Sequence, residues 1–249
     1  MSNDFVVGAG AGIGRFLVER MDAQPFLRGD SLEAVKNADT IIYCAASARF
    51  ETPLDMLYRA MEDNLLLLER VTRLPHKRFV YFSSIDVYPR TGGPHHEDDM
   101  RTIEALPGGY ASFKLMGEAM VLERCTAPLI LRPASLFGPG MRPNNIMRLL
   151  QGDPAGLSLT RDARFNCVTY DMIAELIAAA LAQSISGTFN CASASTISLG
   201  DVAKMCGYEG PFGDHDYCAP DVANDKACAL VPAYGRSSAR ILEDVRRHI

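Results

Sequence analysis

A glycine-rich segment near the N-terminus strongly limits how this chain can fold. The segment VVGAGAGIG (residues 6–14) follows a short apolar run and leads into the helical pattern IGRFLVERM (13–21), so it joins a strand to a helix. Glycine permits a tight turn that a bound anion can approach closely, and the helix N-terminus offers unpaired N–H groups. We therefore expect the turn to bind the pyrophosphate of a dinucleotide. The expected contacts are Gly8, Gly10, Gly12, Ile13 and Gly14.

Apolar runs of strand length alternate with helical segments through the first half of the chain. TIIYCAA (40–46), KRFVYFSS (77–84) and APLILRP (127–133) are apolar enough for strands that are covered on both faces. A long helix is expected between the first two runs (52–74), and another, which contains YASFK (110–114), between the last two. This alternation predicts an α/β fold with a doubly wound parallel sheet.

The pattern changes after Pro133, where the expected elements become shorter and glycine and proline more frequent. A clear helix, YDMIAELIAAALAQ, and a strand, GTFNCAS, still follow one another within this part. We expect a dinucleotide-binding domain over 1–137, to which 168–191 returns. The remainder of 138–249 is expected to form a smaller substrate-binding α/β lobe.

Composition and charge argue against several classes of partner. The net charge is −5 and no run of lysine or arginine stands out, so nucleic acid is not expected as a partner. No stretch of 18 apolar residues predicts a membrane span, and no basic segment followed by a long apolar one predicts a signal peptide. The seven scattered cysteines, without C-x-x-C, indicate reduced thiols in a cytoplasmic protein. The acidic loop HHEDD (95–99) is expected to be solvated, and no metal site is predicted.

The glycine spacing, G-x-x-x-G-x-G, resembles that of the short-chain dehydrogenase/reductase superfamily, with Val7 in place of the usual threonine. Four later segments are similar, in the same order, to motifs of its extended branch, the NAD-dependent epimerase/dehydratase family. These are YFSSIDVYPR (81–90), YASFK, LRPASLFGPG (131–140) and RFNCVTYDMIAEL (164–176). The resemblance implies a Rossmann-type fold and runs from Phe5 to the final helix.

The resemblance implies that Ser84, Tyr110 and Lys114 are catalytic. Tyr110 and Lys114 lie one turn apart on a helix, although a core tyrosine and a solvated lysine would show the same spacing. In the family, the tyrosine moves a proton while hydride passes to or from NAD or NADP, and the serine binds the substrate oxygen. A neighbouring ammonium and the charge of the nicotinamide are expected to lower the pKa of Tyr110. Tyr110, Lys114, Ala45 and Pro133 are also expected to contact the cofactor.

Two further positions have alternative interpretations. Asn64 lies on an apolar helix face with Leu68 and Val71, so it is either a satisfied core amide or, as in the family, a fourth catalytic residue. Asp30 lies 22 residues after Gly8, which suits a ribose-binding acid, but it also matches a later family segment near adenine. Arg28 could pair with the 2′-phosphate of NADP, or be a solvated residue at a strand end.

The adenine side is also expected to be shortened. Only 25 residues (15–39) separate the glycine turn from the strand at 40, so one βα unit of the family fold is missing. This shortening raises the alternative of a non-catalytic nucleotide-sensing or scaffold protein.

The resemblance also implies a substrate class. Sugar dehydratases of the family carry T-D-E where this chain has Ser84-Ile85-Asp86, so dehydration is disfavoured. The expected activity is that of an NAD(P)-dependent oxidoreductase on a nucleotide-sugar, as epimerase or 4-keto reductase; another small carbonyl or alcohol is the alternative substrate. A homodimer through the fourth and fifth helices is also expected. The expected substrate contacts are Ser84, Asp86, Arg142, Asn144, Asn145 and Arg164.

Overall fold

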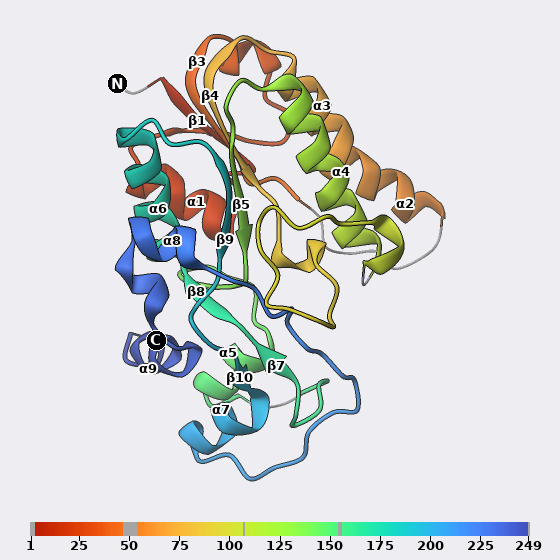
Figure 1. The fold of residues 1–249 in the computed structure, drawn as a ribbon, viewed down its shortest axis with the longest axis vertical. Coiled ribbons are helices and arrows are strands. Elements are labelled where there is room, and N and C mark those ends of the chain that lie inside the picture. Colours follow the sequence, from red (N-terminus) through yellow and green to blue (C-terminus); the bar gives the residue numbers. More distant parts are fainter. Residues whose placement is uncertain (1–2, 47–53, 107, 154–155, 249) are drawn as a thin grey trace.

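A six-stranded parallel sheet forms the upper part of the molecule in the computed structural model, which describes residues 3–46, 54–106, 108–153 and 156–248 (Figure 1). Its strands run in the order β2-β1-β3-β4-β5-β9, and every neighbouring pair is parallel. The predicted doubly wound parallel sheet is therefore confirmed. The strands are β1 (Asp4–Val7), β2 (Gln24–Phe26), β3 (Ala38–Tyr43), β4 (His76–Phe82), β5 (Leu129–Pro133) and β9 (Gly187–Cys191).

The sheet is short on the side of β2. A doubly wound dinucleotide fold has two strands beyond β1 on this side, whereas here β2 alone pairs with the outer edge of β1. Helix α1 (Gly12–Arg20) connects β1 to β2, and a short 3₁₀ helix, η1 (Leu32–Val35), leads on to β3. One βα unit is thus missing, as the sequence predicted.

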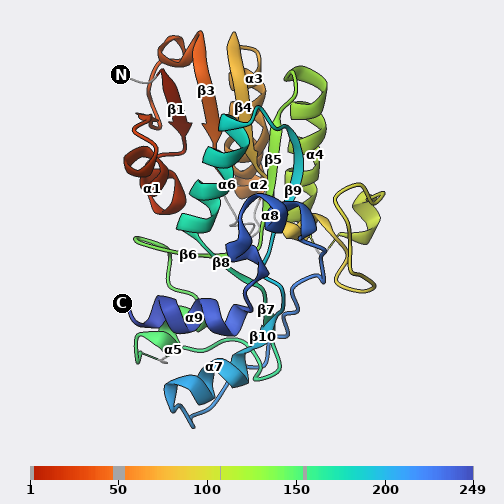
Figure 2. The same ribbon diagram turned by 60° about the vertical axis from the view of Figure 1, so that its left-hand side comes forward.

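Helices cover both faces of the sheet (Figures 1 and 2). Helices α1 and α6 (Tyr170–Ala182) lie on one face, and α3 (Leu67–Thr72) and α4 (Gly109–Arg124) on the other. Each face of the sheet has its own hydrophobic core. Each strand contributes side chains to both cores, because successive side chains of a strand point to opposite faces. In β1, for example, Val6 joins the core under α1 and α6, while Phe5 and Val7 join the core under α3 and α4.

The long helix predicted for 52–74 is interrupted, and its first two residues lie outside the described part of the chain. It consists of α2 (Leu54–Met61), a π-helical segment η2 (Glu62–Leu66), and α3. The amide of Asn64, which is 3% exposed, donates a 2.8 Å hydrogen bond to the carbonyl of Ala60 within this segment. A π turn adds one residue to a helix and rotates the residues around it, often beside a functional site.

The lower lobe is built from short elements. Strand β6 (Ser135–Phe137) pairs with β8 (Cys167–Thr169), and β7 (Arg164–Phe165) with β10 (Ile197–Ser198). After β8 the chain returns through α6 to β9 in the main sheet. The domain boundaries proposed from the sequence stay a prediction. The remaining elements are η3 (Ile85–Val87), η4 (Ile103–Ala105), α5 (Asn145–Leu150), α7 (Leu199–Cys206), α8 (Asp225–Leu230), η5 (Pro232–Gly235) and α9 (Ser238–Arg246).

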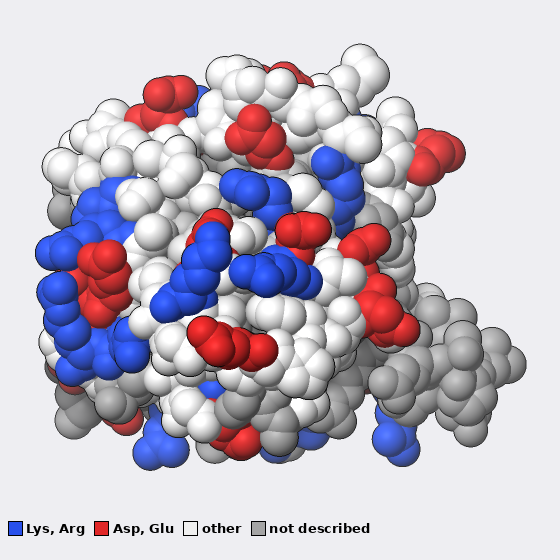
Figure 3. All heavy atoms as spheres, turned by 90° about the horizontal axis from the view of Figure 1, so that it is seen from below, with Lys and Arg blue, Asp and Glu red and all other residues white. Residues whose placement is uncertain are grey.

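Charges on the lower face are mixed. Seen from below, lysine and arginine side chains lie among aspartate and glutamate side chains (Figure 3). On α9, Arg240 forms an ion pair with Glu243 at 3.0 Å. Among the described helices, none is long and apolar enough to cross a membrane.

Candidate active site

Two cavities lie along the carboxyl edge of the parallel sheet. The glycine-turn cavity, of 780 Å³, is bordered by the segments that follow β1, β2 and β3. The serine–tyrosine cavity, of 330 Å³, is bordered by the segments that follow β4 and β5. Because these strands are neighbours in the order β2-β1-β3-β4-β5, the two cavities follow one another along a single edge. Ligands of doubly wound folds bind at this edge, where the strand order reverses.

The glycine turn has the backbone geometry that a dinucleotide site needs. Gly8 has a φ of +92°, and a side chain at Gly14 would lie 2.2 Å from the carbonyl oxygen of Gly8. Gly10 borders the cavity, and nothing would lie within 4 Å of a side chain there. Ala11, the N-cap of α1, provides no capping side chain, so the helix offers backbone N–H groups to an anion. These residues fit a bound pyrophosphate.

Most of the cofactor contacts predicted from the sequence border the glycine-turn cavity. They are Gly8, Gly10, Gly12, Ile13, Asp30 and Ala45. Gly14 is not among the lining residues, and packs instead beneath the turn against Gly8. Pro133 lines the serine–tyrosine cavity. Its predicted contact with the cofactor stays a prediction.

Tyr170, at the start of α6, closes one wall of the glycine-turn cavity. Its hydroxyl forms a hydrogen bond with the backbone of Ile13, and burial raises the pKa of this phenol to about 12. Gly138 leaves room for the ring, because a side chain there would come within 2.2 Å of it. Arg142 borders the same cavity, although the sequence placed it among the substrate contacts.

Ser84, Tyr110 and Lys114 come together at the second cavity. Ser84 and Tyr110 both line it, from the end of β4 and the first turn of α4. Lys114, one turn further along α4, is 3% exposed and has its Nζ 5.7 Å from the centroid of the Tyr110 ring. Its ammonium donates a 2.6 Å hydrogen bond to the carbonyl of Phe82. Cys44, whose thiol lies close enough to Lys114 for the two groups to affect each other's pKa, lines the glycine-turn cavity.

The protein alone shifts the pKa of Tyr110 in the direction opposite to the one predicted. Burial raises this pKa, and the carboxylate of Asp86 raises it further. Burial also lowers the pKa of Lys114 to about 8. The predicted lowering by Lys114 was wrong for the protein by itself, because desolvation disfavours the charged form of both groups.

Asp86 connects Ser84 to the lower lobe. The hydroxyl of Ser84 donates to Asp86 Oδ2 at 3.2 Å, and the backbone N–H of Asp86 donates back to Ser84 Oγ at 3.1 Å. Asp86 Oδ1 accepts a 2.9 Å hydrogen bond from Arg90, whose guanidinium lies 4.5 Å from the centroid of the Tyr217 ring. Tyr217 lines the cavity from the loop-rich segment 207–235, where no sequence pattern marks it.

A buried ion pair supports this wall from behind. Arg132 on β5 binds both carboxylate oxygens of Glu118 on α4, at 2.8 and 2.7 Å, and both side chains are almost fully buried. Ser83, next to Ser84, donates to the same carboxylate at 2.5 Å. A bidentate ion pair of this kind fixes the relative orientation of the two side chains as well as their distance. It therefore holds β4, β5 and α4 in register around the cavity.

Four other predicted residues, all in the described part of the chain, do not line either cavity. Asn64 is in the core, Asn144 caps α5 by accepting from the N–H of Met147, and Asn145 binds Ser158. The guanidinium of Arg164 donates to Thr196 Oγ1 at 2.9 and 3.1 Å. Their proposed roles in catalysis or substrate binding stay predictions.

Solved structures share this fold over the whole chain. MoeE5 in complex with UDP-glucuronic acid and NAD matches with a TM-score of 0.78 and 20% identity, over 99% of both chains. UDP-glucuronic acid 4-epimerase from Bacillus cereus matches with 0.76 and 18%, over 98% of this chain and 99% of that one. A dTDP-4-dehydrorhamnose reductase from Clostridium acetobutylicum matches with 0.76 and 15%, over 98% of both.

Comparison with curated protein sequences found no match. The sequence model of one family, described as the NAD dependent epimerase/dehydratase family, matches residues 26–192, which is more than half of the chain. The matched region includes the serine, tyrosine and lysine segments as well as β5 and α6. The chain therefore belongs to the NAD-dependent epimerase/dehydratase family.

Proposed function

We propose that this protein is an NAD(P)-dependent epimerase or 4-keto reductase that acts on a nucleotide-sugar. The observation that carries the proposal is the placement of the two cavities on neighbouring strands, with Ser84 and Tyr110 lining the second cavity and the Lys114 ammonium 5.7 Å from the Tyr110 ring. A dinucleotide seated on the glycine turn would supply or accept the hydride. A substrate in the second cavity would lie beside Ser84 and Tyr110.

Each of the three residues has a role that its surroundings support. The Ser84 hydroxyl, which now donates to Asp86, would turn to donate to the substrate oxygen. Tyr110 would take the proton from a substrate hydroxyl, or return it to a carbonyl oxygen. With a pKa of about 8, Lys114 keeps most of its charge at pH 7. Together with the positive charge of an oxidised nicotinamide, it would have to offset the burial that raises the pKa of Tyr110.

The size of the serine–tyrosine cavity supports a small substrate group there. At 330 Å³ it is at the lower end of the range for small-molecule sites. Serine hydroxyls (Ser83, Ser84, Ser135) and a single carboxylate, Asp86, suit a sugar with several hydroxyl groups. A cavity of this size also suits another small carbonyl or alcohol, which is the second candidate substrate. Ile85, where dehydratases have an acid, disfavours dehydration.

The test separates binding from turnover. The full chain is titrated with NADH and NADPH by fluorescence, and then assayed with UDP-glucose, UDP-glucuronic acid and small ketones. Tyr110→Phe is expected to keep dinucleotide binding and to lose turnover by at least about a hundredfold. Tyr208→Phe, whose hydroxyl binds a loop carbonyl after α7, is the matched control. Absence of binding by either dinucleotide would favour the non-catalytic alternative.

We also propose that the protein is a cytoplasmic homodimer. Exposed apolar side chains occur on α2 and η2, at Tyr58 and Leu66, and on α4, at Met116 and Leu122. The two helical segments lie on the same face of the sheet (Figure 1).

The cysteines of the described chain are all free, which suits a reducing compartment.

A further inference from the structure

The end of the glycine-turn cavity next to β2 is lined by two arginines and three carboxylates. Arg28 binds Asp63 at 2.6 Å, and Arg70 binds Glu62 at 2.5 Å. The third carboxylate, Asp30, accepts a 2.7 Å hydrogen bond from the backbone N–H of Leu27. Each arginine at this end is thus already bound to a carboxylate, and two positive against three negative groups leave a formal charge of −1.

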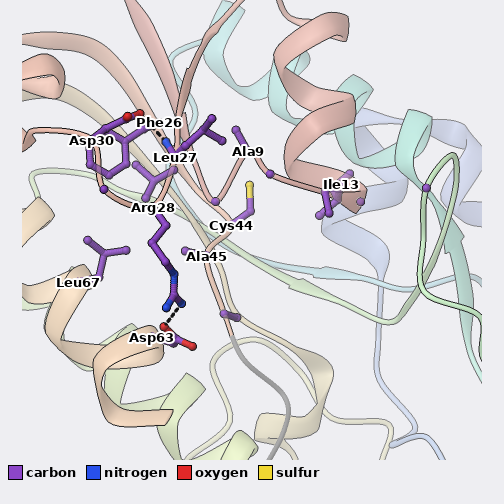
Figure 4. Close-up of a pocket in the computed structure, with 18 of the residues that line it drawn as sticks. Ala9, Ile13, Phe26, Leu27, Arg28, Asp30, Cys44, Ala45, Asp63 and Leu67 are labelled. Carbon is purple, nitrogen blue, oxygen red and sulfur yellow. Dashed lines mark hydrogen bonds and ion pairs between the residues drawn. The ribbon is translucent and has the colours of Figure 1, made fainter. Parts of the chain in front are cut away.

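The pair of Arg28 and Asp63 joins two walls of the cavity. Arg28 leaves the loop that follows β2, while Asp63 belongs to the π-helical segment η2. Figure 4 shows the Arg28 side chain extended toward Asp63 beside Ala45. The side chain of Arg28 is 87% exposed and that of Asp63 is 28% exposed, so a ligand in the cavity could reach both. Asn64, the next residue, is buried in the core.

This end is where the adenosine ribose of a dinucleotide should lie. In doubly wound folds the ribose lies near the end of the strand beside β1, where an acid binds its 2′-hydroxyl or an arginine binds the 2′-phosphate of NADP. Here β2 is the strand beside β1, and Arg28 follows it closely. An arginine alone would favour NADP. Asp63 neutralises this arginine and repels a phosphate, whereas its carboxylate can accept a hydrogen bond from a ribose hydroxyl.

We propose that Asp63, through its ion pair with Arg28, makes the glycine-turn cavity select NAD(H) and reject NADP(H). This inference rests on the proposed function, because it assigns the cofactor of that same site. The Glu62–Arg70 pair provides a matched control, since it lines the same cavity and has the same charges.

The experiment is a titration of the full chain with NADH and with NADPH, followed by fluorescence. The wild type is expected to bind NADH at least about tenfold more tightly. Asp63→Asn should strengthen NADPH binding about fivefold, the factor that corresponds to releasing an exposed ion pair. In an Arg28→Leu background the same substitution should give a smaller gain, because the cation that binds the phosphate is missing and only the repulsion by Asp63 is relieved. Glu62→Gln should change the preference by less than about twofold.

The outcomes separate this inference from the proposed function. Binding of neither dinucleotide by the wild type would overturn the proposed function and this inference with it. Equal affinities in the wild type, an unchanged preference in Asp63→Asn, or a gain of the same size without Arg28 would overturn the inference alone. A gain in Glu62→Gln equal to that in Asp63→Asn would do the same, since it would show a general charge effect. Circular dichroism verifies that each variant is folded. Asp63→Ser, which also removes the carboxylate, repeats the test with a second substitution.

Discussion

Lys114 is a buried cation whose presence costs stability. Its pKa is about 8 in the folded protein and near 10.5 in the unfolded chain. Between these values the unfolded chain holds a proton that the folded protein has released, so the free energy of unfolding rises with pH. This contribution of Lys114 extends from pH 8 to about 10.5. The buried thiols of Cys44, Cys167 and Cys191, whose pKa values burial raises to about 12, act in the opposite direction above about pH 9, as the buried tyrosines do above about pH 10. The contribution is therefore measured as the difference between the wild type and a variant without Lys114.

Lys114→Met is expected to remove this contribution and to stabilise the protein at pH 7. Removing the buried charge is expected to raise the free energy of unfolding by about 3 kcal/mol. Loss of the hydrogen bond to Phe82 lowers it by about 1–2 kcal/mol, so the net effect is stabilising. Urea unfolding at pH 7 and pH 9.5 measures both effects. Lys204→Met, at an exposed position on α7, is the control. If Lys114→Met were less stable than the wild type at pH 7, burial would not be the dominant influence on Lys114.

The carboxylate of Asp86 is expected to hold the pKa of Tyr110 high. Asp86→Asn removes that negative charge but keeps a polar side chain beside Ser84, so the pKa of Tyr110 should fall. The difference in phenolate absorbance between each protein and its Tyr110→Phe derivative, followed over pH, isolates this group. Asp98→Asn is an exposed control. An unchanged titration of Tyr110 would show that burial alone sets its pKa.

At the scale of residues, the sequence was informative about spacing and uninformative about environment. A helix brings positions i and i+4 together, which is why Tyr110 and Lys114 could be paired before the structure was known. The sign of the pKa shift of Tyr110 depends on burial by distant segments and on the side chain of Asp86, which no local pattern specifies. Tyr217 reaches the cavity from a loop for the same kind of non-local reason.

Among the elements, the glycine turn allows folding and binding to be tested separately. Gly10→Ala places a methyl group where nothing lies within 4 Å, so it should leave the melting temperature unchanged and weaken dinucleotide binding by occupying the cavity. Gly14→Ala places a methyl group 2.2 Å from the carbonyl oxygen of Gly8 and should lower the free energy of unfolding by about 2 kcal/mol or more. Thermal melts and NADH titrations of both variants measure this. Equal losses of stability would contradict the assigned geometry.

Element types were easier to predict than their internal irregularities. The cap of α7 is a local feature, because the hydroxyl of Ser198 accepts from the N–H of Asp201, three residues later, at 3.0 Å. The π segment η2 was missed, because apolar residues continue through it with a helical period. What marks the change is a backbone bond, from the N–H of Leu67 to the carbonyl of Glu62 five residues back. That segment carries Asp63, so the missed irregularity coincides with the residue proposed to select the cofactor.

For the whole molecule, the sheet followed from the sequence while the lower lobe did not. Long apolar runs identify the central strands, and the short interval between the glycine turn and β3 revealed the missing unit. The strands β6, β7, β8 and β10 have only two or three residues each. They exist through pairing with distant segments, as Arg164 with Ser198 shows, and no pattern so short is specific.

The dimer proposal is also tested on the whole molecule. Leu66 on η2 is 44% exposed and Leu122 on α4 is 57% exposed, so pairing of these helices between two copies would bury both. The wild type should sediment at twice the mass of the chain, whereas Leu66→Asp and Leu122→Asp should sediment as monomers with unchanged circular dichroism, because a buried unpaired carboxylate opposes association. Met100→Asp, at a 94% exposed residue outside these helices, should remain dimeric. A monomeric wild type would contradict the dimer proposal. Dissociation of all three variants alike would show that this helical face is not the dimer contact.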